Sequence, residues 1–111
     1  MNLSTSTIVA GDDAVISLSG EIDMATIPLL HDALSKALNH HPGRALIIDL
    51  DGVTVLDDCG LGVLLGAAGS ARQAGADLVV VCNNNRLRER LDVTGFSRAV
   101  EVRERLKGDR S

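Results

Sequence analysis

Two short, strongly apolar segments separated by a helical pattern constrain the fold of this 111-residue chain more than any other feature. They span residues 45–50 and residues 78–82. Apolar runs of this length are typical of central strands that are covered on both faces. Between them, apolar residues recur at helical spacing over residues 60–74. A strand, a helix and a second strand in this order predict a parallel β-α-β unit.

The segments on either side extend this pattern. Residues 5–10 and 14–19 predict a β-hairpin around a Gly-Asp-Asp turn. A helix is expected over residues 27–39, with Thr26 as its N-cap and a proline in its first turn. Three asparagines precede a third predicted helix, and residues 99–102 predict an edge strand. The chain is therefore expected to form one small α/β domain with a mostly parallel sheet.

Composition argues against several classes of function. The net charge of −4 and the presence of one Phe, with no Trp or Tyr, disfavour direct nucleic-acid binding. The N-terminus lacks the features of a signal peptide, and no segment approaches the roughly 20 apolar residues of a membrane span. We therefore expect a cytoplasmic protein. The spacing of His31, His40 and His41 predicts no metal site.

The sequence also lacks the features of common enzyme sites. Glycines 60, 62 and 66 resemble a dinucleotide-binding turn only weakly, because no ribose-binding acid follows the next strand. No Gly-Lys-Ser/Thr motif is present, and no Ser-His-Asp or Cys-His set has an evident orientation. We therefore expect no catalytic residues, no cofactor and no enzymatic activity.

An acidic pair, Asp57 and Asp58, leads into the glycine-rich start of the second predicted helix. Acidic groups there satisfy free N–H donors and complement the helix dipole, which stabilises a helix by about 0.5–2 kcal/mol. The same position also suits a binding surface.

Gly62, Gly66 and Gly69 lie within this predicted helix, and each destabilises it by about 1 kcal/mol relative to Ala. Because a glycine has no side chain, these positions predict close approach of the helix to the sheet or to a partner.

The run from Asp57 to Gly62 closely resembles the phosphorylation-site segment of the STAS domain of bacterial anti-sigma factor antagonists. The family pattern there is roughly Asp-Ser-Ser-Gly-Leu-Gly. Residues 18–23, 48–53 and 88–95 resemble other family segments in the same order, so the likeness covers residues 8–102. It implies a mixed sheet of about four to five strands with helices mainly on one face. The domain would span residues 1–103, followed by a polar C-terminal tail of residues 104–111.

The resemblance also implies a regulatory role and a site. Members of the family bind an anti-sigma factor, usually a serine kinase, and the first Ser of the motif is the regulatory phosphoacceptor. Here that position holds Asp58, and the second Ser is replaced by Cys59. The implied partner-binding residues are Asp23, Asp57, Asp58, Cys59, Gly60, Leu61 and Gly62.

The charge of Asp58 leaves two alternatives open. A phosphoserine carries about −1.5 to −2 charges at pH 7, whereas an aspartate carries one, so Asp58 mimics phosphorylation only in part. Either the protein is locked in a phospho-like state of low affinity, or its partner surface has adapted and it binds constitutively.

Further alternatives concern partners and reactive groups. The chain resembles, less closely, the STAS subunits of membrane lipid-transport ATPases, and a weak homodimer is another partner hypothesis. Cys59 and Cys82 are either a redox-active pair at one sheet edge or two small buried apolar residues. The basic residues Arg86, Arg88 and Arg90 are either a solvated helix face or a secondary contact with the partner.

Overall fold

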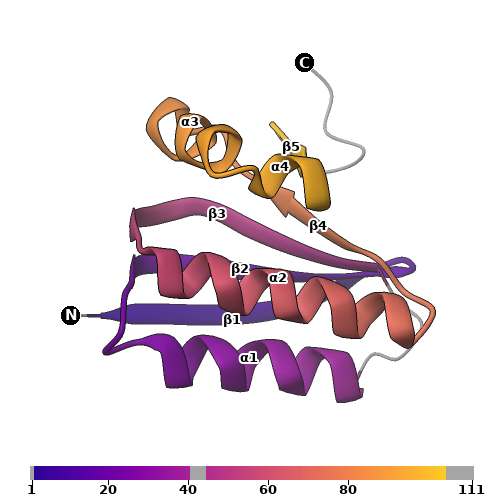
Figure 1. Cartoon of the computed structure of the whole chain (residues 1–111). Helices are drawn as coiled ribbons and strands as arrows, with labels where there is room; N and C mark the ends of the chain where they lie inside the picture. The colour runs from indigo at the N-terminus through magenta and orange to yellow at the C-terminus, as the bar shows by residue number, and fades with distance from the viewer. Residues whose placement is uncertain (1, 41–44, 105–111) are drawn as a thin grey trace.

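Five strands form one mixed sheet in the computed structural model, which describes residues 2–40 and 45–104 (Figure 1). Their spatial order follows the sequence, and only the first two strands are antiparallel to each other. They are β1 (Leu3–Ala10), β2 (Asp13–Ile22), β3 (Ala45–Leu56), β4 (Leu78–Val81) and β5 (Glu101–Arg103). The predicted hairpin and the parallel β-α-β unit are confirmed.

Four helices accompany these strands in the described part of the chain: α1 (Ile27–His40), α2 (Asp58–Gln73), α3 (Asn85–Val93) and α4 (Phe96–Ala99). Figure 1 shows α1 and α2 side by side against the same face of the sheet. The main core lies under the helices and takes alternate strand residues such as Ile16, Ile48 and Val80, each 0% exposed. The α/β fold with helices mainly on one face is confirmed.

The opposite face of the sheet corrects one expectation. The apolar run at residues 45–50 was expected to be covered on both faces, but no helix of the described residues packs there. Val15, Ile47 and Val81 form a separate small cluster on this face. Val15 pairs with Ile47, and Ile47 pairs with Val79, so branched side chains on adjacent strands shield one another. Cross-strand packing therefore buries these residues without a second layer.

The β2–β3 pair extends well beyond its predicted length. β3 ends at Leu56 instead of residue 50, and β2 stays paired with it as far as Ile22. Two register irregularities in the β2–β3 pairing accompany this extension, with one extra residue in β3 at each, and bulges of this kind increase local twist. β4 pairs with β3 only from Leu46 to Asp49. The extension therefore projects past β4, with β1 still paired to β2 as far as Gly20, and it ends where the acidic residues begin.

The C-terminal third contains one helix that the sequence pattern did not reveal. Gly95 has a φ of 84°, a conformation that suits glycine, and it separates α3 from α4. Phe96 then anchors α4 in the core. Because α4 occupies residues up to Ala99, the final strand is β5 instead of residues 99–102. Residues 41–44, which follow α1, and residues 105–111 of the predicted tail lie outside the described residues.

Candidate functional site

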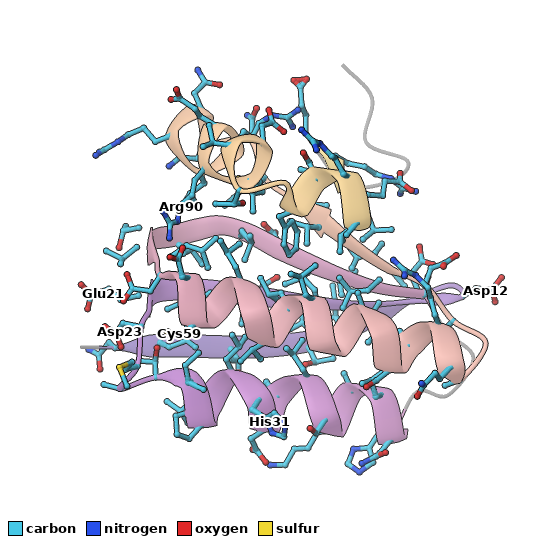
Figure 2. All side chains as sticks on the ribbon, viewed as in Figure 1. Asp12, Glu21, Asp23, His31, Cys59 and Arg90 are labelled. Carbon is cyan, nitrogen blue, oxygen red and sulfur yellow. The ribbon has the colours of Figure 1, made fainter. Side chains whose placement is uncertain are left out.

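The candidate site lies where β2 and β3 end side by side and α2 begins. Asp23 follows β2, and Asp57 follows β3. The backbone N–H of Asp57 donates to the carbonyl of Ile22 at 3.0 Å, which continues the pairing of the two strands to their last residues. Figure 2 shows Asp23, Cys59 and Arg90 at this end of the molecule, around the start of α2.

Asp23 holds the turn between β2 and α1. Its Oδ1 accepts hydrogen bonds from the backbone N–H groups of Ala25 at 3.0 Å and Thr26 at 3.1 Å. Thr26 is only 2% exposed, and its hydroxyl donates to the carbonyl of Glu21 at 2.8 Å and accepts from the N–H of Asp23 at 3.0 Å. Thr26 directly precedes α1, as expected, and its hydroxyl bonds hold the turn before the helix in place. The turn presents Met24, which is 81% exposed.

The acidic pair occupies two different positions at the start of α2. The helix begins at Asp58, two residues earlier than predicted, and Asp57 is its N-cap residue. The carboxylate of Asp57 makes no capping hydrogen bond, so the side-chain capping interpretation is wrong for this residue. Instead, its carbonyl accepts from the N–H groups of Gly60 and Leu61. Asp58 lies in the first turn, where its negative charge complements the helix dipole.

Gly60 fixes the start of α2 against the end of the sheet. A Cβ atom there would lie 2.3 Å from Ile22 Cγ2 and 3.1 Å from Leu56 Cδ1, so no larger residue fits without displacement. Along the same helix, a Cβ at Gly62, Gly66 or Gly69 would meet no atom within 4 Å. The expectation that these three glycines permit close approach to the sheet is therefore wrong. Instead, there is open space beside the helix backbone at these three positions.

A hollow of about 490 Å³ lies beside Gly62 in the first turns of α2, facing α4 and the turn before it. Leu65 remains accessible there, with 40% of its surface exposed. The hollow therefore combines an acidic rim with apolar walls. It is lined by Asp58, Leu61, Gly62, Leu65, Thr94, Gly95, Phe96 and Ala99.

The three arginines of α3 have three different environments. Arg90 Nη2 lies 2.5 Å from Asp58 Oδ1, which joins α3 to the first turn of α2. Arg88 Nη1 donates to the carbonyl of Cys82 at 3.2 Å. The side chain of Arg86 is exposed. The basic cluster is therefore not a uniform solvated face, because one of its members belongs to the candidate site.

Comparisons with known proteins identify the family of this chain. The family model of the STAS domain matches residues 5–108. The chain belongs to the STAS-domain family. It is 37% identical to an anti-sigma-B factor antagonist of Listeria monocytogenes over 92 residues, which cover 83% of this chain and 80% of that protein.

Two further relatives extend over nearly the whole STAS domain. An anti-sigma-B factor antagonist of Staphylococcus aureus is 25% identical over 104 residues, covering 94% of this chain and 95% of that protein. The crystal structure of an anti-sigma factor antagonist from Mycobacterium paratuberculosis superposes with a TM-score of 0.85 at 27% identity, covering 95% of this chain and 88% of that one. The predicted family membership is therefore confirmed.

The two thiols of this STAS domain are free and differ in environment. Cys59 is half-buried in the first turn of α2. Cys82 is fully buried, and its Sγ donates to the carbonyl of Asn84 at 3.7 Å. Burial raises the pKa of the Cys82 thiol. Since β4 ends opposite Asp49 while β3 continues to Leu56, Cys82 does not reach the sheet end at which α2 starts.

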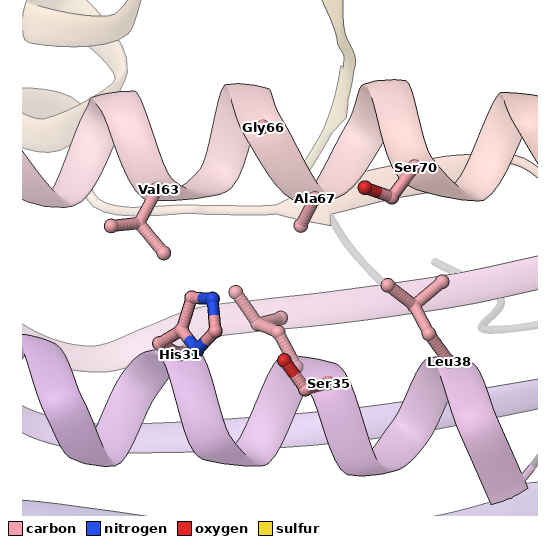
Figure 3. A pocket seen from close by; sticks show the side chains of 8 residues that line it. His31, Ser35, Leu38, Val63, Gly66, Ala67 and Ser70 are labelled. Carbon is pink, nitrogen blue, oxygen red and sulfur yellow. The ribbon is translucent and has the colours of Figure 1, made fainter.

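A second hollow of about 260 Å³ lies between α1 and α2 (Figure 3). His31 and Ser35 of α1 face Val63 and Ala67 of α2 across it.

Within residues 2–40 and 45–104, no three His, Cys, Asp or Glu side chains come together as a metal site. No helix in these ranges is long and apolar enough to span a membrane.

The family resemblance grouped Asp23, Asp57 and Asp58 as partner-binding residues, but sequence reasoning missed two residues that organise this end of the sheet. Thr26 was expected only as a helix cap, and Arg90 only as one of three basic residues. Glu21, the partner of Thr26, lies five residues away within the same turn, whereas Asp58, the partner of Arg90, lies 32 residues away and is brought close only by tertiary structure. For Arg90 the one available signal was its helical spacing from Leu87, which placed it one turn along α3 from a core residue.

Proposed function

We propose that this STAS domain is an anti-sigma factor antagonist that acts by binding, without catalysis or cofactor, an anti-sigma factor of the serine-kinase type in the cytoplasm. The observation that carries the proposal is the 37% identity to an anti-sigma-B factor antagonist over 83% of the chain. The proposed binding residues are Asp23, Asp57, Asp58, Cys59, Gly60, Leu61 and Gly62.

Exposed apolar residues around the start of α2 support a protein partner. Met24 lies in the turn after β2, Val55 lies near the end of β3, and Leu65 lines the hollow beside Asp58. Val93 ends α3 and is 79% exposed. Accessible apolar side chains gathered around a polar rim are typical of protein-binding surfaces. This surface is therefore the proposed docking site for the anti-sigma factor.

Asp58 is proposed to occupy the regulatory position of this surface. A carboxylate has no hydroxyl for a serine kinase to phosphorylate and no phosphoester for a phosphatase to remove. The charge at this position would therefore be constant. In this proposal, binding is controlled by the amounts of the partners and not by modification of residue 58.

The glycines of α2 provide a sharp test of the docking site. A Cβ at either Gly62 or Gly69 meets no atom within 4 Å, so G62R and G69R should both fold. Of these two glycines, Gly62 lines the hollow beside Asp58 and Gly69 does not. Each variant and the wild type would be used for affinity capture from lysate of the source organism, followed by mass spectrometry. We expect an anti-sigma factor to be retained by the wild type and G69R and lost with G62R.

Other results would contradict the proposal. Capture of an anti-sigma factor by all three proteins would move the docking site elsewhere on the domain. Capture of a membrane lipid-transport ATPase in place of an anti-sigma factor would favour the transporter-subunit alternative. D58S, captured in parallel, would show whether a serine at the proposed regulatory position restores phosphorylation by the retained kinase.

A further inference from the structure

Arg90 and Asp58 form an ion pair between two helices that are 32 residues apart in the sequence. Asp58 contributes an exposed carboxylate, with 87% of its side-chain surface accessible. Arg90 is more enclosed, with 37% accessible. Within residues 2–40 and 45–104, Asp58 has no other cationic partner at ion-pair distance.

The position of Arg90 is determined by packing as well as by charge. It lines a hollow of about 250 Å³ together with Val55, Leu56 and Leu87. Its Nε is inaccessible and has no hydrogen-bond partner. An ordinary surface ion pair gains little because two mobile side chains must be ordered. Here the Asp58 side chain is short and the Arg90 side chain is already confined. Pairing therefore costs less side-chain conformational entropy than in an ordinary surface ion pair.

We propose that Arg90 is a positioning residue that neutralises Asp58 and so lets the start of α2 bind its partner constitutively. This inference rests on the proposed function and addresses the regulation of the same surface. The guanidinium offsets the one negative charge of Asp58 within the domain itself. Asp58 and Arg90 together then carry no net charge where a partner would bind, whereas a phosphorylated residue at position 58 would carry a net negative charge.

This arrangement distinguishes the two roles that the sequence left open for Asp58. A phosphoserine carries about −1.5 to −2 charges, so one arginine would leave it with net negative charge. One arginine balances one aspartate. Asp58 with Arg90 is therefore electrostatically closer to an uncharged serine than to a phosphoserine.

Cys59 offers a probe of this balance that needs no partner, because it adjoins Asp58 and is half-buried at the helix start. Its reaction rates with an anionic and a cationic methanethiosulfonate, the sulfonatoethyl and trimethylammonioethyl reagents, report the local potential. Peptide mass mapping separates its modification from that of buried Cys82. We expect R90Q to lower the ratio of the anionic to the cationic rate about threefold, as expected for one charge within a Debye length.

R86Q is the matched control, because Arg86 lies on the same helix and carries the same charge but makes no ion pair with the described residues. We expect it to change the ratio by less than about 1.5-fold at physiological ionic strength. Equal effects of R90Q and R86Q would show that Arg90 is not held beside Asp58, and this would overturn the proposal.

The second experiment measures the affinity of the anti-sigma factor retained in the capture experiment, by calorimetry with four purified proteins. R90Q should weaken binding at least tenfold relative to the wild type, while D58S/R90Q should bind within about threefold of D58S. This result would show that Arg90 affects binding only when residue 58 carries a negative charge.

The remaining outcomes separate the two proposals. An equal loss on R90Q substitution in the wild-type and D58S backgrounds would make Arg90 a direct partner contact, and tight binding by R90Q would show that no neutralisation is needed. Either result overturns the inference and leaves the proposed function intact. If no variant retains an anti-sigma factor, the proposed function fails, and the thiol rates still decide whether the pair neutralises Asp58.

Discussion

A β-carbon on Gly60 would lie 2.3 Å from Cγ2 of Ile22, a side chain that is 0% exposed in the core. The last residue of β2 therefore packs directly against the backbone of α2. This contact fixes the height of the helix above the sheet, and with it the positions of Asp58 and Cys59. The site thus depends on a contact that involves none of its exposed side chains.

G60A should destabilise the domain for this reason. Overpacking a filled core costs about 1–3 kcal/mol, and the better helix propensity of Ala returns up to about 1 kcal/mol. We expect a net loss of about 1–2 kcal/mol in the free energy of unfolding, measured by urea denaturation. An unchanged midpoint would mean that α2 shifts freely and that the Ile22 contact does not fix it.

G66A should have the opposite effect on the same helix. A Cβ at this position meets no neighbouring atom within 4 Å, so only the helix propensity changes. We expect the free energy of unfolding to rise by about 0.5–1 kcal/mol. The comparison with G60A separates steric cost from propensity, because both variants make the same chemical change. Destabilisation by G66A would show that α2 needs the bare backbone there for packing.

These two glycines show how far the sequence predicts this fold. The sequence pattern predicted close packing at Gly66 and placed Gly60 only at the start of the helix, but the structure packs Gly60 closely and leaves Gly66 open. The difference arises because Gly60 faces Ile22, a residue 38 positions earlier, while Gly66 faces open space. Periodicity identifies a helix and its buried side, but it does not give the distance between the helix and the sheet.

The same reasoning explains the extended strands and the paired arginine. Residues 51–56 of β3 mix exposed and buried positions, so no apolar run marks them, and only their pairing with β2 makes them a strand. Arg90 reaches Asp58 although the two residues are 32 positions apart, a contact that no local pattern indicates. Chain order and apolar pattern predicted the sheet, and the family resemblance implied a site at the start of α2. The contacts within the site required the tertiary structure.

T26V should destabilise the turn that carries Asp23. The buried hydroxyl of Thr26 serves the carbonyl of Glu21 and the N–H of Asp23, and valine would leave both without this partner. Leaving buried polar groups unpaired costs about 1–3 kcal/mol. Thermal unfolding would measure the loss, with T5V on exposed strand β1 as the control, expected within about 0.5 kcal/mol of the wild type. Equal effects of the two substitutions would rule out a special role for Thr26.

The N-caps of α2 and α3 should differ in strength. Asn84 Oδ1 accepts from the N–H groups of Arg86 at 2.9 Å and Leu87 at 3.3 Å, whereas the side chain of Asp57 caps nothing. N84A should therefore lower the free energy of unfolding by about 1 kcal/mol, and D57A by less than about 0.5 kcal/mol. Denaturant titration of both variants would test this. A larger loss for D57A would mean that its carboxylate caps α2 in solution.

Cys82 should make the domain less stable at alkaline pH. Burial raises the pKa of this thiol in the folded protein, so it stays protonated there while the unfolded chain loses the proton as the pH rises through the ordinary thiol pKa of about 8.5. The unfolded state then binds fewer protons, and the free energy of unfolding falls as the pH rises. C82A removes this contribution. Although its truncated side chain should lower stability at pH 7, its stability should decline less between pH 8 and pH 10. Urea denaturation across this range would measure both slopes, and the other titrating groups cancel in their difference. Identical slopes would show that Cys82 ionises equally in the folded and unfolded states.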